Sequence, residues 1–457
     1  IKRVNGKGES MTFETKGKEN NGATYGRRSD WQDLYSIAKK YYEALLADPG
    51  NALFHLTDPR GASDKSGRTF NNPYQYFFEQ MHMDDAIYAD ESIYEYPMQQ
   101  GGGNDGRPYS FGRPSSGGSK AAYPCKSYGQ GRINPAYFYG VFDPNDMRRD
   151  VSITMTGSNG KGVEKLIPFV PNSKAEGGGL TLNKWDENRQ ANPWVAAQRK
   201  SGINGPYMRM SEVYLGYAEV CAALGDVVTG KQYLKTVRER SFPQGLANTD
   251  AFIASFGNDL VRAIIEERGF EYAGEGDRRW TLIRSGYLPE DIKRIKDMTK
   301  AMMDGLATKG YYEFENGNII SAYIWTKLVD AKTIYGHRLT AQCPTDKVND
   351  PVLYPGWRGQ KDNWEEMGLN YGSSTPATNL AIKGLFEIVS EEEAASLESQ
   401  GYTKVNWGID LVDNRDEYDK YLFWDYDYVS APIYLWPFTP NVMAAGGFTN
   451  GYGFKQE

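Results

Sequence analysis

Apolar residues recur at helical spacing in several stretches of the chain. In Trp31–Leu46 they stand at positions 31, 34, 35, 38, 42, 45 and 46, and the sequence DPGN ends the pattern. This spacing predicts an amphipathic helix that stops at the turn. Asn72–Met83 predicts a second helix, with Pro73 in the first turn, where proline is well tolerated.

The middle of the chain predicts a helical hairpin. Pro206–Leu224 has Pro206 near its start, apolar residues at helical spacing and Gly225 as a stop signal. Gly230–Arg240 predicts a second helix, so the two form an antiparallel hairpin about the size of a tetratricopeptide unit. Further helices are predicted over Asn258–Tyr272, Asp277–Arg284, Leu288–Leu306 and residues 375–389.

Between Gln99 and Gln130 the chain is rich in glycine and has no hydrophobic period. Loops of this length within a globular protein are usually functional or disordered. The aromatic residues in this stretch argue against disorder, because disordered segments are poor in aromatics. Short strands are predicted after Asp150 and over Lys165–Val170. The tail, Tyr421–Phe454, is apolar but interrupted by proline and glycine, which predicts an extended surface segment.

Composition narrows the possible functions. The 457 residues are 40% hydrophobic, enough for a sizeable core, and no run approaches the roughly 18 apolar residues of a membrane span. A net charge of −7 argues against a nucleic-acid partner, which requires a basic face. Three cysteines and three histidines predict neither a disulfide framework nor a zinc module. The usual phosphate-loop, metalloprotease and esterase motifs are missing from the sequence, and no GxGxxG is expected to be followed by a helix.

Charged residues concentrate in and after the stretch PYMRMSEVYLGYAEV. Arg209 and Glu212 stand three positions apart, so they share one helix face and can touch. Arginines outnumber lysines in the following segments, as expected for bidentate, half-buried ion pairs. These charges predict either a structural network between consecutive helices or a clamp for an anion or substrate.

Three segments resemble the SusD/RagB family of nutrient-binding lipoproteins on the outer surface of Gram-negative Bacteroidota. They are PYMRMSEVYLGYAEVCAALGD, YLKTVRERSFP and IIEERGFEYAGEGDRRWTLIRSG, and FDPNDMRRDV and DESIYEYPM also look like family segments. The positions that match the family pattern are Arg209, Glu212, Tyr214, Tyr217, Glu219, Arg238, Arg240, Glu267, Arg268, Glu271, Glu275, Gly276 and Arg278.

The chain also departs from the family pattern. Thr281 stands where the family usually has aspartate, and Lys235 where it has asparagine. Family members begin with a lipidated cysteine and several tetratricopeptide-like helices, whereas the first cysteine here is Cys125. We therefore expect the N-terminal part of the family fold to be absent from this chain.

The resemblance implies a mainly α fold, in which tetratricopeptide-like helical hairpins form a superhelix and a loop-rich, few-stranded remainder packs against it. It implies one domain over residues 1–457. Its parts are the end of the N-terminal helical region (1–90), a loop-rich ligand-binding segment (91–205), the core hairpins (206–310) and an irregular C-terminal segment (311–457).

The resemblance further implies a non-catalytic protein that is lipid-anchored at the outer membrane and passes glycans to a SusC-like TonB-dependent transporter. A structural ion-pair role is implied for Arg209, Glu212, Arg238, Arg240, Glu267, Arg268, Glu271, Glu275 and Arg278. Aromatic rings can stack on the apolar face of a sugar while polar groups bond its hydroxyls. The candidate ligand-binding residues are Tyr109, Arg113, Tyr123, Tyr128, Tyr137, Asn183, Trp185 and Trp194, with Trp357 and Trp364 as second choices. Packing in the core is the alternative for each of them.

Two other functions stay open. The same scaffold could bind peptides, as RagB-type relatives do, or the chain could be a glycan hydrolase with a pair of carboxylates beside stacked aromatics. No cofactor is expected. The acidic stretch from Asp410 to Tyr428 could hold a structural calcium ion, although it lacks the ligand spacing of a calcium loop and a solvated acidic surface is the better explanation.

Overall fold

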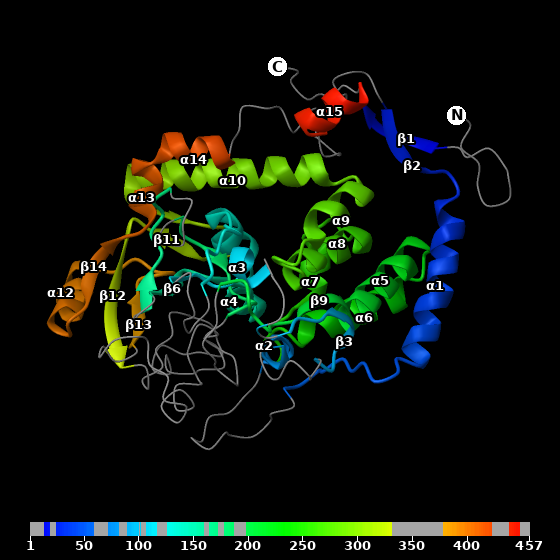
Figure 1. Ribbon diagram of the computed structural model, residues 1–457, viewed down its shortest axis with the longest axis horizontal. Helices are drawn as coiled ribbons and strands as arrows, with labels where there is room; N and C mark the ends of the chain where they lie inside the picture. The colour runs from blue at the N-terminus through cyan, green and yellow to red at the C-terminus, as the bar shows by residue number, and fades with distance from the viewer. Residues whose placement is uncertain are drawn as a thin grey trace.

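The computed structural model describes residues 13–18, 24–58, 72–81, 89–99, 101, 107–116, 126–159, 164–171, 178–186, 198–330, 378–422 and 438–447. Helices predominate in this part of the chain (Figure 1), which confirms the predicted mainly α class. The helices are α1 (Trp31–Ala47), α2 (Pro73–Gln80), α3 (Arg107–Phe111), the π-helix η1 (Tyr137–Val141), α4 (Arg148–Ser152), α5 (Met210–Ala223), α6 (Val227–Glu239), α7 (Thr249–Ala254), α8 (Leu260–Glu271), α9 (Asp277–Ser285), α10 (Leu288–Lys309), α12 (Glu391–Ser399), α13 (Gly408–Asp413), α14 (Arg415–Leu422) and α15 (Pro440–Gly446).

The strands are short and form small separate sheets. Antiparallel pairs join β1 (Phe13–Lys18) to β2 (Thr24–Arg28), β3 (Ser92–Tyr96) to β9 (Gly205–Arg209), β5 (Ile153–Thr154) to β8 (Thr181–Leu182), and β10 (Tyr311–Glu313) to β11 (Ile319–Ser321). Two three-stranded sheets have the orders β4-β6-β7, built from Ser115–Ser116, Thr156–Asn159 and Glu164–Leu166, and β13-β12-β14, built from Thr378–Lys383, Tyr323–Asp330 and Thr403–Asn406.

Helices α5 and α6 form the predicted hairpin. Gly225 adopts a positive φ of 91° in the connection, a backbone conformation that glycine allows without strain. The Asp226 side chain then accepts from the Thr229 amide and caps α6. The hairpin packs on α8 through Leu215, Leu234 and Ile264, and α1 lies against α5 on the outside.

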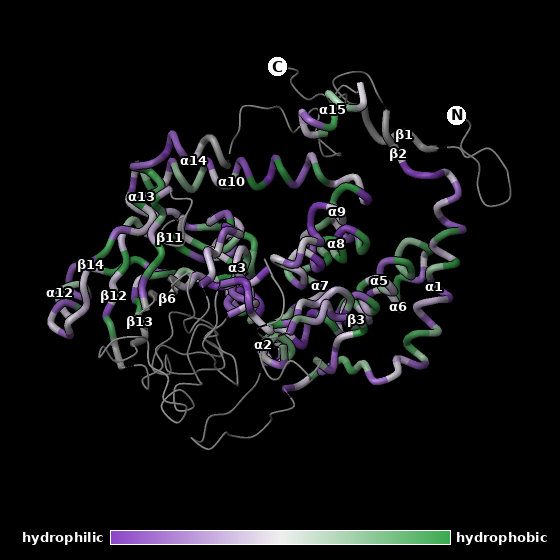
Figure 2. The backbone as a smooth tube through the Cα atoms, viewed as in Figure 1, coloured by the Kyte–Doolittle hydropathy of each residue, from purple (hydrophilic) through white to green (hydrophobic). Residues whose placement is uncertain are grey.

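The long helix α10 connects the helical hairpins to the second, mixed part of the molecule (Figure 1). Hydrophobic and hydrophilic residues alternate along it in Figure 2, as in a helix with one buried stripe. Met302, Met303 and Leu306 form that stripe and belong to the largest hydrophobic core. No helix in the part of the chain described above is long and apolar enough to cross a membrane.

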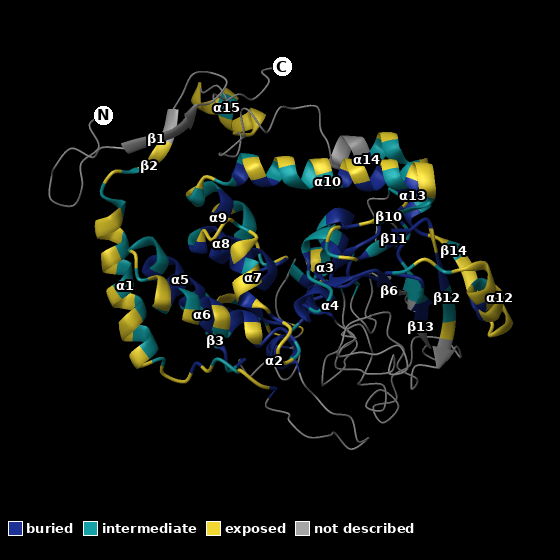
Figure 3. Cartoon of the chain, turned by 180° about the vertical axis from the view of Figure 1, so that it is seen from behind, coloured by how far each residue is buried: buried dark blue, intermediate teal, exposed yellow. Residues whose placement is uncertain are grey.

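The largest core lies between α10, the segment around η1 and the sheet β13-β12-β14. Its centre is Trp407, which is fully buried and donates from Nε1 to the Tyr139 hydroxyl at 2.8 Å. Figure 3 shows buried residues concentrated on α5, α8 and around α4, while α1 keeps an exposed outer side.

Three secondary-structure predictions were wrong. Residues 206–209 belong to strand β9 and not to the first turn of a helix, since Arg209 is extended at φ −138° and ψ 164° and α5 begins at Met210. Thr378–Lys383 is a strand within the segment predicted to be helical. Within the tail expected to be extended, Pro440–Gly446 is helical.

Candidate functional site

Strands β3 and β9 form a two-stranded ribbon that carries exposed tyrosines. The pairing shifts between Tyr94, which faces Met208, and Glu95, which faces Pro206, so Tyr207 is an extra residue on β9. Such a bulge re-aims the side chain of the extra residue. As a result Tyr207 and Met208 both face solvent although they are consecutive.

Tyr94 and Tyr207 make an edge-to-face pair on the outer side of this ribbon. Their ring centroids lie 5.5 Å apart with the planes at 86°, and the two side chains are 55% and 75% exposed. Tyr96, two residues along β3, is exposed as well. We call Tyr94, Tyr96 and Tyr207 the tyrosine ribbon. Large exposed aromatic groups held in place by a regular element are typical of binding surfaces.

The inner side of the ribbon is fixed by a buried carboxylate. Oε1 of Glu95 accepts from the Ala89 amide at 2.8 Å and from the Ser92 hydroxyl at 2.6 Å. Its Oε2 accepts from Nδ2 of Asn204 at 2.9 Å, and Oδ1 of Asn204 accepts from the Met98 amide at 2.8 Å. These bonds tie the residues before and after β3 to Asn204, which directly precedes β9. The exposed rings are therefore positioned before any ligand arrives.

A second aromatic pair lies on and beside α3. Tyr109 and Tyr128, both predicted ligand residues, are half-buried, and their ring centroids are 4.9 Å apart. The Tyr128 amide donates to the Tyr109 carbonyl at 2.7 Å, which fixes the two backbones side by side. At the start of α3 the Arg107 guanidinium lies 5.6 Å from the ring centre of Tyr96, so α3 adjoins the tyrosine ribbon.

Arg113 and Asn183, two of the predicted polar ligand residues, lie in the interior. Arg113 is buried, donates from Nη2 to the Thr156 hydroxyl at 2.9 Å and lies 3.8 Å from the Asp186 carboxylate. Asn183 is buried too and donates to the Asp150 carbonyl at 3.0 Å. Their placement favours the packing alternative over contact with a ligand.

Trp185 and Tyr137 are also packed inside. Trp185 belongs to a buried cluster with Phe77 and Phe78. The Tyr137 hydroxyl donates to the Gly269 carbonyl at 2.7 Å, and burial raises the pKa of Tyr137. The remaining candidates, Tyr123, Trp194, Trp357 and Trp364, lie outside the described residues.

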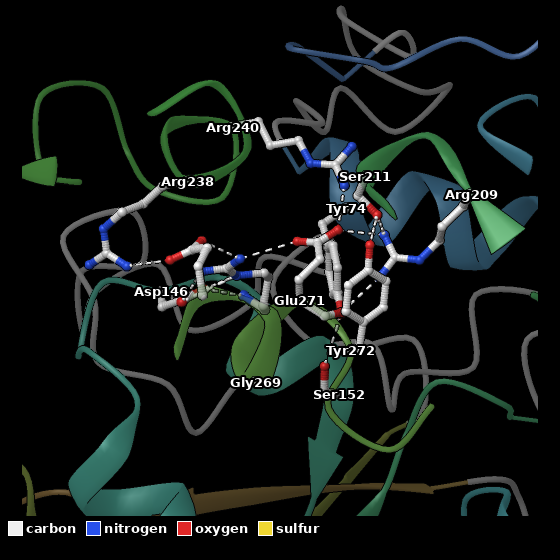
Figure 4. A network of polar contacts seen from close by, with 12 residues as sticks. Tyr74, Asp146, Ser152, Arg209, Ser211, Arg238, Arg240, Gly269, Glu271 and Tyr272 are labelled. Atoms are coloured by element: carbon white, nitrogen blue, oxygen red, sulfur yellow. Dashed lines mark hydrogen bonds and ion pairs between the residues drawn. The ribbon is translucent and has the colours of Figure 1, made fainter. Parts of the chain in front are cut away.

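Beneath the ribbon lies a buried ion-pair cluster, which Figure 4 shows from close by. Arg209, the last residue of β9, reaches α8 with its guanidinium. It donates to the Glu271 carboxylate, to the Glu271 carbonyl at 2.8 Å and to Oε1 of Glu275 at 3.0 Å. Arg209 thus anchors the strand that presents Tyr207.

Glu271 is the centre of this cluster. Besides Arg209, it accepts from Arg240 at 2.6 Å and from Arg148 at 3.1 Å. Burial alone would raise the pKa of Glu271, but the guanidiniums of Arg240, Arg209 and Arg148 outweigh it and hold the pKa well below its usual range. The carboxylate is therefore ionised near neutral pH.

The cluster extends beyond Glu271, and each further carboxylate in it pairs with an arginine or a lysine. Glu91, just before β3, pairs with Arg240 at 2.5 Å and Arg209 at 3.3 Å. Glu267 joins Arg148 to Arg238, at 2.7 Å and 2.9 Å. The cluster contains the cations Arg148, Lys184, Arg209, Arg238 and Arg240 and, against them, the carboxylates Glu91, Asp146, Glu267, Glu271 and Glu275.

The other predicted network residues form two smaller groups. Arg268 bridges Glu212 and Asp277, at 2.6 Å to each, and Arg278 contacts Glu266 at 2.8 Å. The Thr281 hydroxyl accepts from Arg268 and donates to Asp277, so it takes part in the same polar network. These groups tie α5, α8, α9 and α10 together, as the structural alternative requires.

The residues of the tyrosine ribbon were not predicted from the sequence as ligand-binding residues. Its signal was the alternation of Tyr94 and Tyr96 with Ile93 and Glu95, which is typical of a strand with one exposed face. No group of three potential metal ligands occurs among the residues that the structure describes. The calcium ion suggested for the acidic stretch past Asp410 stays a prediction, since the stretch continues beyond the described residue 422.

Comparison with known proteins gives a consistent set of similarities. A model of the SusD family matches residues 53–437. SusD-like protein P25 of Formosa agariphila is 28% identical over 160 residues, which are 35% of this chain and 26% of that protein. The chain thus aligns with about a quarter of the length of that relative.

Similar solved structures include a SusD homolog from Bacteroides thetaiotaomicron, with a TM-score of 0.42 and 17% identity over 58% of this chain and 51% of that one. Surface glycan-binding protein A from the same organism, solved in complex with laminarihexaose, has a TM-score of 0.36 and 18% identity. That similarity covers 57% of this chain and 52% of the other.

Proposed function

The chain belongs to the SusD family, and on this premise we propose that it captures oligosaccharides or polysaccharides at the cell surface without chemical change to them. The capture would feed a SusC-like TonB-dependent transporter in the outer membrane, to which the protein would be held by an N-terminal lipid anchor. The proposed ligand surface is the tyrosine ribbon with the adjoining pair Tyr109 and Tyr128.

The exposed Tyr94–Tyr207 pair carries this proposal. The two phenol rings are set at 86° to each other, and both side chains are more than half exposed. A pyranose ring has an apolar face of C–H groups that stacks on such a ring, while the phenol hydroxyls can bond sugar hydroxyls. Because Glu95 and Arg209 fix the ribbon from inside, binding requires little ordering of the protein.

A binding screen tests the proposal. Isothermal titration would compare a panel of neutral and acidic polysaccharides with a peptide digest, using the wild-type chain and the variants Tyr94→Ala and Tyr207→Ala. Tyr41→Ala is a matched control, since Tyr41 and Tyr207 are both 75% exposed but Tyr41 lies on α1.

We expect heat with at least one glycan, a loss of about tenfold or more in affinity for each ribbon variant and no change for the control. Heat with peptides alone would replace the proposal with the peptide-binding function. Shortened glycan products in the titration cell would indicate a hydrolase.

A further inference from the structure

Arg199 is an exposed cation held in an unusual backbone conformation. Its φ is 65°, in the left-handed region that residues with a side chain seldom adopt. The guanidinium carbon lies 4.4 Å from the ring centre of Tyr109. A cation at this distance is attracted by the ring, so the guanidinium is held in place while its N–H groups can reach solvent.

Lys126 makes the corresponding contact on the other ring of the same pair. Its ammonium nitrogen lies 4.8 Å from the ring centre of Tyr128. Because Tyr109 and Tyr128 pack edge to face, the two cations are carried by one aromatic unit. We call Arg199, Lys126, Tyr109 and Tyr128 the cation–tyrosine cluster.

The two cations differ from the arginines of the buried ion-pair cluster. Arg209, Arg238 and Arg240 also lie over aromatic rings, yet each of them pairs with a buried carboxylate. Arg199 and Lys126 have no carboxylate partner in the part of the chain that the structure describes. Two positive charges at a surface without such a partner can bind the anionic groups of a ligand.

The sequence around the cluster is basic within an acidic chain. Residues 99–137 contain five lysine or arginine residues and a single aspartate, whereas the chain has a net charge of −7. A local excess of one charge sign attracts ligands of the opposite sign and raises their local concentration. Of these five residues, Arg107 lies beside Tyr96 of the tyrosine ribbon, whereas Arg113 is buried against Asp186.

We infer that the ligand of this surface is an anionic glycan, whose carboxylate or sulfate groups bind Arg199 and Lys126 while its sugar rings contact the tyrosine ribbon. This inference rests on the proposed function and specifies its substrate class. A planar guanidinium can donate two parallel hydrogen bonds to a carboxylate or sulfate, and an ammonium adds a point charge.

The test compares each anionic glycan with its uncharged counterpart. Oligogalacturonate and its methyl ester share a backbone and differ in the carboxylate, and κ-carrageenan oligosaccharides and their desulfated form differ in the sulfate. Titration of the wild-type chain at low and high sodium chloride would measure the four affinities. A charge-dependent contact weakens as salt screens it.

Two variants locate the contact. Arg199→Asn removes the charge while asparagine tolerates the left-handed backbone, and Lys126→Gln removes the other charge. Lys300→Gln, on the exposed side of α10, is the control. We expect the anionic member of one pair to bind at least about tenfold more tightly than its counterpart, and each variant to lose about tenfold of that affinity.

The outcomes separate the inference from its premise. Tighter binding of the charged member, in the carboxylate pair or in the sulfate pair, supports the inference and identifies the anionic group. Equal binding of charged and uncharged members overturns it and leaves the proposed function standing, whether or not the variants fold. Binding of uncharged glycans alone has the same meaning. Absence of binding to any glycan overturns the inference together with the proposed function.

Discussion

Arg209 and Glu271 join the aromatic ribbon to the helical frame. Arg209 ends strand β9, two residues after Tyr207, and its guanidinium donates both to the carboxylate and to the carbonyl of Glu271 near the end of α8. The arginine and glutamate side chains of this cluster are placed to support the fold and not to contact a ligand. They are buried, paired with one another and positioned to hold the strand that faces solvent.

Loss of the Glu271 charge should destabilise the protein strongly. Glu271→Gln leaves Arg209, Arg240 and Arg148 short of a shared carboxylate, and an uncompensated buried charge costs about 3–5 kcal/mol. Urea unfolding followed by circular dichroism measures the free energy of unfolding. Glu239→Gln is the control, because the exposed pair of Glu239 with Lys235 should contribute less than about 1 kcal/mol. If the two substitutions lowered the free energy of unfolding equally, the buried cluster would not stabilise the protein more than the surface pair does.

Acid should weaken the protein through the same carboxylate. The three arginines hold the pKa of Glu271 below its value in the unfolded chain, about 4.3, so the unfolded state binds the proton more tightly. The stabilisation is fully present above that pH and is lost as the pH falls below it. The difference in unfolding free energy between wild type and Glu271→Gln should therefore shrink from pH 6 to pH 3. A constant difference over this range would show that the carboxylate is not held ionised by its partners.

Alkaline pH should favour the folded state through Lys184. Burial lowers the pKa of Lys184 to about 8, against the opposing effect of Glu275, whereas an unfolded lysine has a pKa of about 10.4. Between these values the unfolded state binds more protons, so the free energy of unfolding rises with pH. Thermal melts from pH 7 to pH 10 should show that the Tm of the wild type rises relative to the Tm of Lys184→Met. Parallel curves for the two proteins would mean that Lys184 titrates normally.

Trp185 should matter for stability and not for binding. It is buried among Phe77 and Phe78, so Trp185→Ala removes a large core side chain and should cost about 3–5 kcal/mol. Titration of the folded variant with the glycan found in the screen should give an affinity within about threefold of wild type. A tenfold loss of affinity without loss of stability would return Trp185 to the ligand site.

Long periodic segments could be predicted from the sequence, and short apolar ones could not. The helices around Trp31, Leu234 and Met302 follow a sustained spacing, and the structure confirms them. In β13 the consecutive residues Leu380, Ala381 and Ile382 are all buried, so no alternation marks the strand. A short apolar run of this kind is equally compatible with a helix.

Part of the candidate surface, Tyr109 and Tyr128, was named from the sequence, and the tyrosine ribbon was not. The loop-rich segment contains Tyr109 and Tyr128, which the structure brings together. Composition cannot tell an aromatic ring that faces solvent from one that faces the core, and Trp185 faces the core. The position of Tyr207 depends on a bulge, a one-residue shift in strand pairing that has no signature in the sequence around it.

The buried charge cluster also bears on how the chain is made. Glu91 and its partner Arg240 are separated by 149 positions, and Glu271 and Glu275 are synthesised later still. A ribosome that has released Glu91 must add most of the next two hundred residues before every charge can find its counterpart. Until then several of these side chains lack their partners, so the central fold cannot be completed before α8 is present. A chain truncated before α8 would lack Glu267 and Glu271, the carboxylates that pair with Arg148, Arg238 and Arg240.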